Sequence, residues 1–430
     1  MASIAQFGVQ DRQLTDKERW LSFFVLFLFA FVAAFNLFKA APALQFIGLD
    51  FGLDASGIGY IMSAYSISVV VLAYPGMIIM QKVGVKTSIV GASIIMLIGT
   101  LCGTVSTSSA FFMFSRIIEG AAYGAMHVMC PNVMPRLFPQ AKQGLAMGIF
   151  SQCVPVGTII AFFAAPAIFN AAGWRAIWTV SIVLEAITVV CALAFLKMPK
   201  INENELIGSD PTKRRVAGKN FMLPAMLTAV VFFAWTYCYV GNINSLYPTF
   251  LQNEKGLSVF MSSMLPNVTA MISIPTGIFF GALAQSKKCS KELTCWSYII
   301  FGVTLFFMAF TQGSDMIGPW VFCCILGVLG GIIPSTTRII IPLLCPDIKK
   351  TDLGLTTMSF FAGAGQCVGS VVAAGLVAQA GWQFNAHLIL APMAIIAGVL
   401  ILVFVKNDRQ IYQIRAQEEA GADAAAASNR

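Results

Sequence analysis

Long apolar runs alternate with short polar segments along almost the whole chain. Twelve of these runs are long enough to cross a bilayer core of about 30 Å as α-helices. The runs cover residues 20–44, 56–80, 87–106, 110–137, 144–171, 174–196, 221–251, 258–285, 293–312, 318–344, 353–380 and 382–405. The pattern therefore predicts an all-α membrane protein with twelve transmembrane helices.

The longest polar interval inside the chain separates the sixth apolar run from the seventh. This interval, residues 197–220, contains the basic sequence Lys213-Arg214-Arg215. It predicts an N-terminal six-helix bundle over 20–196 and a C-terminal six-helix bundle over 221–405. Polar tails are expected at 1–19 and at 406–430, the second being Ala-rich and expected to be disordered.

Composition supports a membrane location. The 430 residues are 58% hydrophobic and 11% charged, whereas soluble proteins carry about 25% charged residues. The first apolar run is too long for a signal-peptide core, so it is expected to remain as a helix. The cysteines lie mostly inside apolar runs, without metal-ligand spacing, and are interpreted as packing residues.

Lysine and arginine placement predicts the orientation. Most of the 27 basic residues fall in the tails and in alternate loops on the side of the N-terminus, which is expected to be cytoplasmic. Both termini are then cytoplasmic, and a bacterial inner membrane is the expected location. Because the positive charge is spread over short loops, the net charge of +8 does not indicate nucleic-acid binding.

The two halves repeat each other at an almost constant offset. Asn36 and Pro42 match Asn242 and Pro248 at 206 residues, and Gly173-Trp174 matches Gly381-Trp382 at 208. Gly120 and Gly124 likewise match Gly327 and Gly331, and the Pro135–Pro139 segment matches Pro342–Pro346. Two repeats in one membrane orientation are typical of transporters whose halves rock about a midplane site.

The fourth run carries ionisable residues where a lipid-facing helix cannot hold them. Arg116, Glu119, Tyr123 and His127 share one face at about 100° per residue. Ionised groups at this depth cost roughly 2.5–3.5 kcal/mol each, so they usually face a partner or a water-filled path. Alternatively, Arg116 and Glu119 form a pair that only joins two helices.

These features resemble the major facilitator superfamily over residues 20 to about 405. The resemblance rests on the six-plus-six spans, the central basic loop and Arg116-x-x-Glu119-Gly120. Lys82, Gly84 and Lys86 match the family's loop between its second and third helices, but Gln81 replaces the aspartate. The family's charged cytoplasmic latch is therefore expected to be replaced by neutral hydrogen bonds.

The resemblance implies that the first, fourth, seventh and tenth helices line a central cavity. Polar residues of these helices are the candidates for substrate binding: Asn36, Lys39, Tyr123, His127, Tyr237, Asn242, Asn244, Tyr247 and Arg338. The candidates for proton coupling or gating are Arg116, Glu119, Glu185, Lys82 and Gly84.

The charges inside the spans favour an anionic substrate. If Arg116 pairs with Glu119, then Lys39 and Arg338 remain as unpaired cations, one from each half. An arginine can hold a carboxylate in bidentate fashion, and a lysine acts as a point charge. Alternatively, Lys39 reaches the outer headgroups and Arg338 the cytoplasmic phospholipid. The two also differ in depth, so they could serve successive stages of transport.

The function predicted from the sequence is secondary transport of a small carboxylate-like anion by alternating access, as a monomer in the bilayer. Glu119 or His127 would carry a coupled proton, although exchange without protons stays open, and His127 could instead be structural. The alternatives are efflux of hydrophobic or cationic drugs through Glu119 and Glu185, and a non-transporting receptor. No phosphate-binding glycine loop, metal motif or catalytic triad is present in the sequence, so no enzyme activity and no cofactor is expected.

Overall fold

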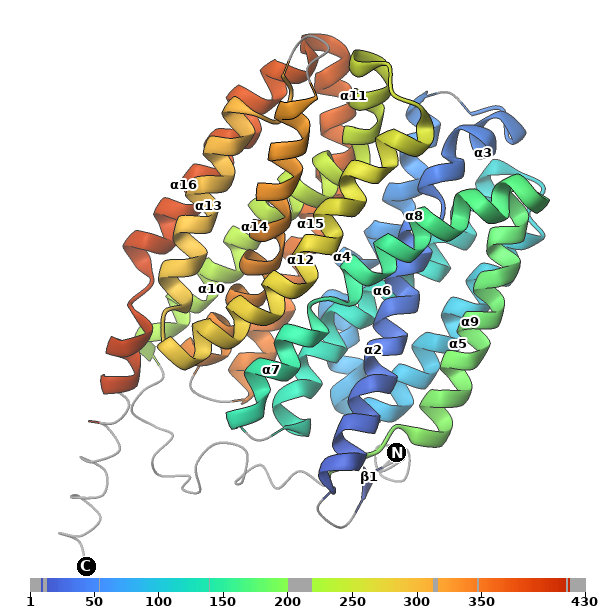
Figure 1. Cartoon of the computed structure of the whole chain (residues 1–430). Coiled ribbons are helices and arrows are strands. Elements are labelled where there is room, and N and C mark those ends of the chain that lie inside the picture. Colours follow the sequence, from blue (N-terminus) through green and yellow to red (C-terminus); the bar gives the residue numbers. More distant parts are fainter. Residues whose placement is uncertain are drawn as a thin grey trace, which may run out of the picture.

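The computed structural model describes residues 9–10, 14–53, 55–138, 140–199, 219–311, 316–345, 348–414 and 417. Most of the predicted central loop and of both tails lies outside these ranges. The described helices correspond to the twelve predicted spans and form two side-by-side bundles (Figure 1). The first span begins and the last ends at the same end of the molecule, which we call the terminal end (Figure 1).

The first six spans form one bundle. They are α2 (Asp16–Phe38), α4 (Ala55–Val83), α5 (Val85–Thr104), α6 (Ser109–Leu137), the pair α7 (Gln140–Phe150) and α8 (Cys153–Ala172), and α9 (Trp174–Phe195). A short 3-10 turn η1 (Ala41–Ala43) and helix α3 (Leu44–Asp50) follow α2 at the far end. Strands β1 (Val9–Gln10) and β2 (Met198–Pro199) pair in parallel.

The last six spans form the other bundle. They are α10 (Lys219–Trp235) continued by the π-helix η3 (Thr236–Asn244) and α11 (Ser245–Lys255), then α12 (Val259–Lys287), α13 (Ser290–Phe307), α14 (Ile317–Leu344), α15 (Ile348–Asn385), η4 (Ala386–Leu390) and α16 (Ala391–Phe404). Within α15 the backbone breaks at Gly381, whose φ of 83° marks the predicted boundary between the last two spans.

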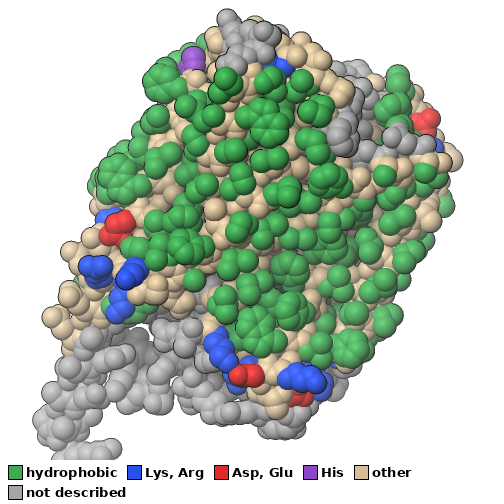
Figure 2. All heavy atoms as spheres, viewed as in Figure 1, with side chains coloured by type: hydrophobic (Ala, Val, Ile, Leu, Met, Phe, Trp, Pro, Cys, Tyr) green, Lys and Arg blue, Asp and Glu red, His purple; other side chains and the backbone are tan. Residues whose placement is uncertain are grey.

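Ten of the described stretches are long and apolar enough to cross a membrane by length and composition. The more polar α6 and α13 pack among them, α6 against α4 and α5, and α13 against α14 and α16. Large apolar side chains such as Phe24, Phe163 and Phe279 are exposed on the outside of the bundles. Apolar side chains cover the middle of the visible face, and charged ones gather toward the terminal end (Figure 2). This surface fits a lipid environment.

The two bundles meet along α4 and α15 on one side and along α7, α8 and α12 on the other. Ser63 and Ser370 hydroxyls lie 3.0 Å apart across this interface, and Tyr74 and Thr357 hydroxyls lie 3.2 Å apart.

An ion pair between the halves lies at the terminal end, where Arg136 donates to Asp352 at 2.6 Å. The expectation that neutral hydrogen bonds alone replace the charged latch is therefore wrong. The charged residues that join the halves lie near the ends of α6 and α15, not in the segment between α4 and α5 where the latch was expected. Of the predicted loop residues, Lys82 lies in the last turn of α4, and Gly84 joins α4 to α5 with a φ of 85° that favours glycine.

Close helix contact in the first bundle depends on Gly120. A Cβ at this position would lie 2.2 Å from the backbone oxygen of Tyr65 on α4. We expect Gly120→Ala to lower stability by about 1–3 kcal/mol, because the two backbones must separate. The matched control is Gly91→Ala on α5, where nothing lies within 4 Å of the added atom. Thermal unfolding in detergent measures both, and equal melting temperatures would contradict this packing account.

Candidate functional site

A cavity of about 80 Å³ lies between the two bundles. Both halves line it through side chains of α6, α8, α10, η3, α12, α14, α15 and the α7–α8 junction. The lining residues are Tyr123, His127, Ser151, Val154, Pro155, Thr158, Phe232, Trp235, Thr236, Tyr239, Val240, Asn244, Ala270, Ser273, Gly330, Pro334, Arg338, Ala362 and Gln366. We call it the central cavity.

Arg338 supplies positive charge to the central cavity from α14. Its guanidinium donates to the Ser151 hydroxyl at 3.0 Å, which links the two halves. No carboxylate in the described part of the chain forms an ion pair with Arg338, and no acidic residue lines the cavity. The guanidinium therefore keeps N–H groups that can donate hydrogen bonds to a bound anion.

Tyr123 and His127 form the wall of the cavity on α6. Their rings lie 4.3 Å apart, edge to face, and His127 Nδ1 lies 3.0 Å from the Tyr123 backbone oxygen. The Ser359 hydroxyl on α15 donates to the His127 carbonyl at 2.6 Å. Both residues therefore occupy the predicted face, held by local contacts and by one contact to the other half.

An aromatic part of the lining comes from the seventh span. Trp235 and Tyr239 stack with ring centroids 4.6 Å apart, and Tyr239 shares a side-chain hydrogen bond with Asn244. Here the span is a π-helix, η3, rather than a regular α-helix. Such widened turns are rare and often occur at functional sites.

A second polar group, which we call the ion cluster, lies inside the N-terminal bundle and away from the central cavity. It contains Lys39, Arg116, Glu119 and Glu185, all with no exposed surface. Arg116 donates to Glu119 at 2.6 Å, and Lys39 pairs with the other oxygen of the same carboxylate. Lys39 Nζ also lies 3.1 Å from the Ser181 hydroxyl.

Aromatic rings and helix carbonyls complete the ion cluster. The Lys39 ammonium lies 4.6 Å from the Trp178 ring centroid, and the Arg116 guanidinium lies 4.4 Å from that of Tyr65. Arg116 also donates to the carbonyls of Asn36 and Leu37 at 3.0 and 3.3 Å. The expectation that Lys39 is an unpaired cation is therefore wrong, because it turns into the bundle toward Glu119.

Four other candidates also lie outside the cavity lining. Asn36 donates to Glu185 at 2.6 Å, and Asn242 accepts from Asn385 at 2.8 Å, so each joins spans of its own bundle. Tyr237 is buried beside Phe233, and Tyr247 packs among Phe250, Phe310 and Phe322. Of the nine predicted substrate contacts, Tyr123, His127, Asn244 and Arg338 line the central cavity.

Sequence reasoning missed polar lining residues on spans that the family resemblance does not assign to the cavity. These are Ser151 and Thr158 of the fifth span, Ser273 of the eighth and Gln366 of the eleventh. Gln366 donates to Ser66 of α4 at 2.8 Å, which holds it at the interface. A single hydroxyl or amide in an apolar run is too common to mark a site, so no sequence signal identified them.

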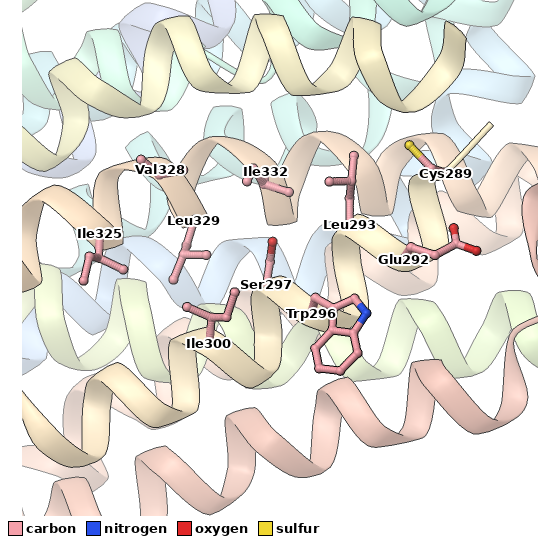
Figure 3. Close-up of a pocket in the computed structure, with 10 residues that line it drawn as sticks. All are labelled: Cys289, Glu292, Leu293, Trp296, Ser297, Ile300, Ile325, Val328, Leu329 and Ile332. Carbon is pink, nitrogen blue, oxygen red and sulfur yellow. The ribbon is translucent and has the colours of Figure 1, made fainter. Parts of the chain in front are cut away.

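A larger hollow of about 460 Å³ lies between α13 and α14 (Figure 3). Its lining is almost entirely apolar, with Trp296 and Ile300 exposed at its edge. The Glu292 carboxylate lies at one end (Figure 3). The described residues that line this hollow include no lysine or arginine.

Comparison with known proteins identifies the family. The model of the Major Facilitator Superfamily matches residues 26–358. The chain is 22% identical over 409 residues to a hexuronate transporter of Bacillus subtilis (strain 168), covering 91% of this chain and 96% of the relative. It is 24% identical over 413 residues to the quinolone resistance protein NorA of Staphylococcus aureus (strain MRSA252), covering 90% and 97%.

A solved structure also aligns over most of the chain. It is that of the human organic anion transporter MFSD10, with a TM-score of 0.70 at 12% identity, covering 90% of this chain and all of the other. This likeness agrees with the arrangement of twelve spans in two bundles. The chain belongs to the major facilitator superfamily, whose members are membrane transporters.

Proposed function

We propose that the protein is a secondary transporter of a small organic monoanion, which Arg338 binds through its carboxylate. The observation that carries this proposal is an arginine in a cavity between the halves with no carboxylate partner in the described chain. Arg338 is half-buried, so its charge is partly desolvated without a counter-ion, and a substrate carboxylate that accepts two of its N–H groups offsets that cost. One free cation favours one negative charge on the substrate.

The aromatic wall favours a substrate with a ring. Trp235 and Tyr239 contribute a stacked pair to the cavity lining, and Tyr123 and His127 line it from α6. Ring-bearing substrates gain contact area against such walls without forming further ion pairs. The names of two similar proteins, a hexuronate transporter and an organic anion transporter, agree with a carboxylate cargo.

In this proposal the protein works as a monomer by alternating access. The terminal end is cytoplasmic, as the positive charge of the adjoining segments indicates, and the membrane is the bacterial inner membrane. The Arg136–Asp352 pair and the packing of α7 against α12 close the cytoplasmic side. Transport requires this pair to separate, which would open the central cavity to the cytoplasm.

Efflux of cationic drugs has less support. That alternative assigns substrate binding to Glu119 and Glu185, but Glu119 is held by two cations inside the ion cluster. Neither carboxylate lines the central cavity. A cationic compound in the cavity would instead face Arg338.

Competition binding to the purified protein tests the proposal. Radiolabelled D-glucuronate is the probe, and the competitors are its neutral amide, a ring-free monocarboxylate and an organic amine. Carboxylates are expected to compete, with the ring-bearing ones strongest, while the amide and the amine do not. Equal competition by the neutral amide would show that the carboxylate is not recognised.

Tyr239→Ala tests the aromatic wall. We expect it to weaken glucuronate binding about 3- to 10-fold, because stacking contacts of this kind contribute roughly 0.5–1.5 kcal/mol beyond buried area. Binding of the ring-free carboxylate lactate should change less than twofold. Tyr239→Phe is the matched control, since it keeps the ring and loses only the hydroxyl. A uniform loss for both ligands would argue against stacking.

A further inference from the structure

One carboxylate of the ion cluster, that of Glu185, forms no salt bridge in the described part of the chain. Glu119 accepts hydrogen bonds from Lys39 and Arg116. Glu185 has two neighbours within hydrogen-bond distance, the Asn36 amide and the Thr100 hydroxyl, each 2.6 Å from its Oε1. Glu185 Oε2 has no hydrogen-bond partner in the described chain, although the side chain is completely buried. A fully ionised carboxylate in this position would be poorly compensated.

Thr100 gives a second, independent reason to place a proton here. Its hydroxyl oxygen lies 2.8 Å from Glu119 Oε1 and 2.6 Å from Glu185 Oε1. A threonine hydroxyl has one hydrogen and can donate to only one of these oxygens. The other contact needs a hydrogen from the carboxyl group itself. One proton on Glu185 completes the chain from Glu185 to Thr100 and from Thr100 to Glu119.

The C-terminal repeat shows that a carboxylate is not needed to join these spans. In the first bundle, Asn36 of the first span contacts Glu185 of the sixth. In the second bundle, the equivalent Asn242 of the seventh span contacts Asn385 of the twelfth at 2.8 Å. In the second bundle, two neutral amides therefore join the corresponding pair of spans. At the 208-residue offset of Gly173-Trp174 and Gly381-Trp382, the position equivalent to Glu185 is Met393, so this carboxylate is present in one half only.

We propose that Glu185 binds the proton that moves together with the substrate anion. This inference rests on the proposed transport of a monoanion. The Glu185 carboxylate takes the proton from water on one side of the membrane and releases it to water on the other. No bond other than O–H forms or breaks, and Thr100 and Glu119 accept the hydrogen bonds of the protonated state.

The surrounding charges distinguish Glu185 from the other candidates. The charged groups near it are Lys39 after α2, and Arg116 and Glu119 on α6, while α8 carries no charged residue. On α5, Lys86 donates to the Leu193 carbonyl, eight residues along α9 from Glu185. Protonating Glu119 would leave two buried cations without a carboxylate. A charged His127 would share the cavity with Arg338. Glu185 can take a proton without breaking any ion pair.

The charge count inside the spans is consistent with symport of one proton and one anion. When Glu185 is ionised and the cavity is empty, three cations and two carboxylates give a net charge of +1 inside the spans. Adding one anion to the cavity and one proton to Glu185 leaves this charge unchanged. The empty and the fully loaded forms therefore carry the same net charge inside the spans when they change conformation. A form loaded with only the anion or only the proton carries a different net charge.

Glu185→Gln tests the proposal in sealed proteoliposomes. Glutamine keeps the size and the hydrogen bonds of a protonated carboxyl group but cannot release a proton. Wild-type protein should accumulate radiolabelled glucuronate about tenfold under an inward gradient of one pH unit, the limit for one proton per anion. Glu185→Gln should lose this accumulation while keeping counterflow exchange of labelled for unlabelled glucuronate.

The control is Glu292→Gln on α13. Glu292 also has a buried carboxyl oxygen without a partner in the described chain, but it lies outside the central cavity and the ion cluster. It should keep both accumulation and exchange. If Glu185→Gln does not fold, Thr100→Val is the second variant, because it removes the hydroxyl that joins the two carboxyl groups. It should shift the pH dependence of accumulation.

The outcomes separate this inference from the proposed function. If wild-type protein exchanges glucuronate but a pH gradient never drives accumulation, or if folded Glu185→Gln still accumulates it tenfold, the proton site is wrong while anion transport stands. If wild-type protein exchanges no carboxylate at all, the proposed function fails first. Loss of gradient-driven accumulation in Glu185→Gln alone, with exchange retained, supports the proton site.

Discussion

Arg338→Ala is expected to weaken carboxylate binding by about 100-fold or more. Truncating one partner of a buried, hydrogen-bonded charge pair typically costs about 2–5 kcal/mol, and each 1.4 kcal/mol is a factor of ten. Among the described residues that line the central cavity there is no other lysine or arginine to replace the guanidinium. Equilibrium binding of radiolabelled glucuronate to purified protein measures the change.

Two variants separate charge from shape at this position. Arg338→Lys keeps the charge but loses bidentate geometry, so its affinity should lie between wild type and Arg338→Ala. Ser151→Ala removes the protein partner of the guanidinium and leaves the arginine in place. It should keep binding within a few fold. If Arg338→Ala binds glucuronate as tightly as wild type while folding normally, Arg338 does not anchor the substrate.

Lys39→Ala is expected to lower the stability of the folded protein and to leave its affinity for the substrate unchanged. Removing one partner of a buried salt bridge typically costs about 3–5 kcal/mol. Lys39 is fully buried between Glu119, Ser181 and the Trp178 ring, and its loss leaves the cluster short of one cation. We expect lower expression and a lower melting temperature, while the protein that remains folded binds glucuronate with unchanged affinity.

The Lys142–Asp16 pair is the matched control for this effect. It is also a lysine–carboxylate pair, 2.6 Å apart, but both side chains are largely exposed. Lys142→Ala should cost at most about 1 kcal/mol, because exposed pairs contribute little. Thermal melting followed by size-exclusion chromatography compares the two. A normal melting temperature together with lost binding in Lys39→Ala would place Lys39 at the substrate instead.

The spans were predictable because a bilayer imposes a strict length and polarity rule on each helix. The predicted order of twelve spans and the boundary at Gly381 are confirmed. The Arg116–Glu119 pair could also be foreseen, since residues at i and i+3 meet on one helix without help from the rest of the fold.

The partners of side chains between helices could not be predicted in the same way. Periodicity gives the depth and the face of Lys39, but not the neighbouring helix on which a complementary carboxylate lies. In the seventh span the π-helix adds a residue to the turn, so Tyr239 and Asn244 line the cavity while Tyr237 and Asn242 do not. The sequence carries no clear signal for such a local change of register.

Counterflow in proteoliposomes containing wild-type or Arg338→Ala protein tests the central claim most directly. Vesicles loaded with unlabelled glucuronate are diluted into labelled glucuronate, so that exchange requires substrate binding on both sides but no gradient. Wild-type vesicles should take up the label, and Arg338→Ala vesicles should not. Equal uptake by both proteins, or wild-type vesicles that exchange a neutral or cationic solute but no carboxylate, would contradict an arginine-anchored anion transporter.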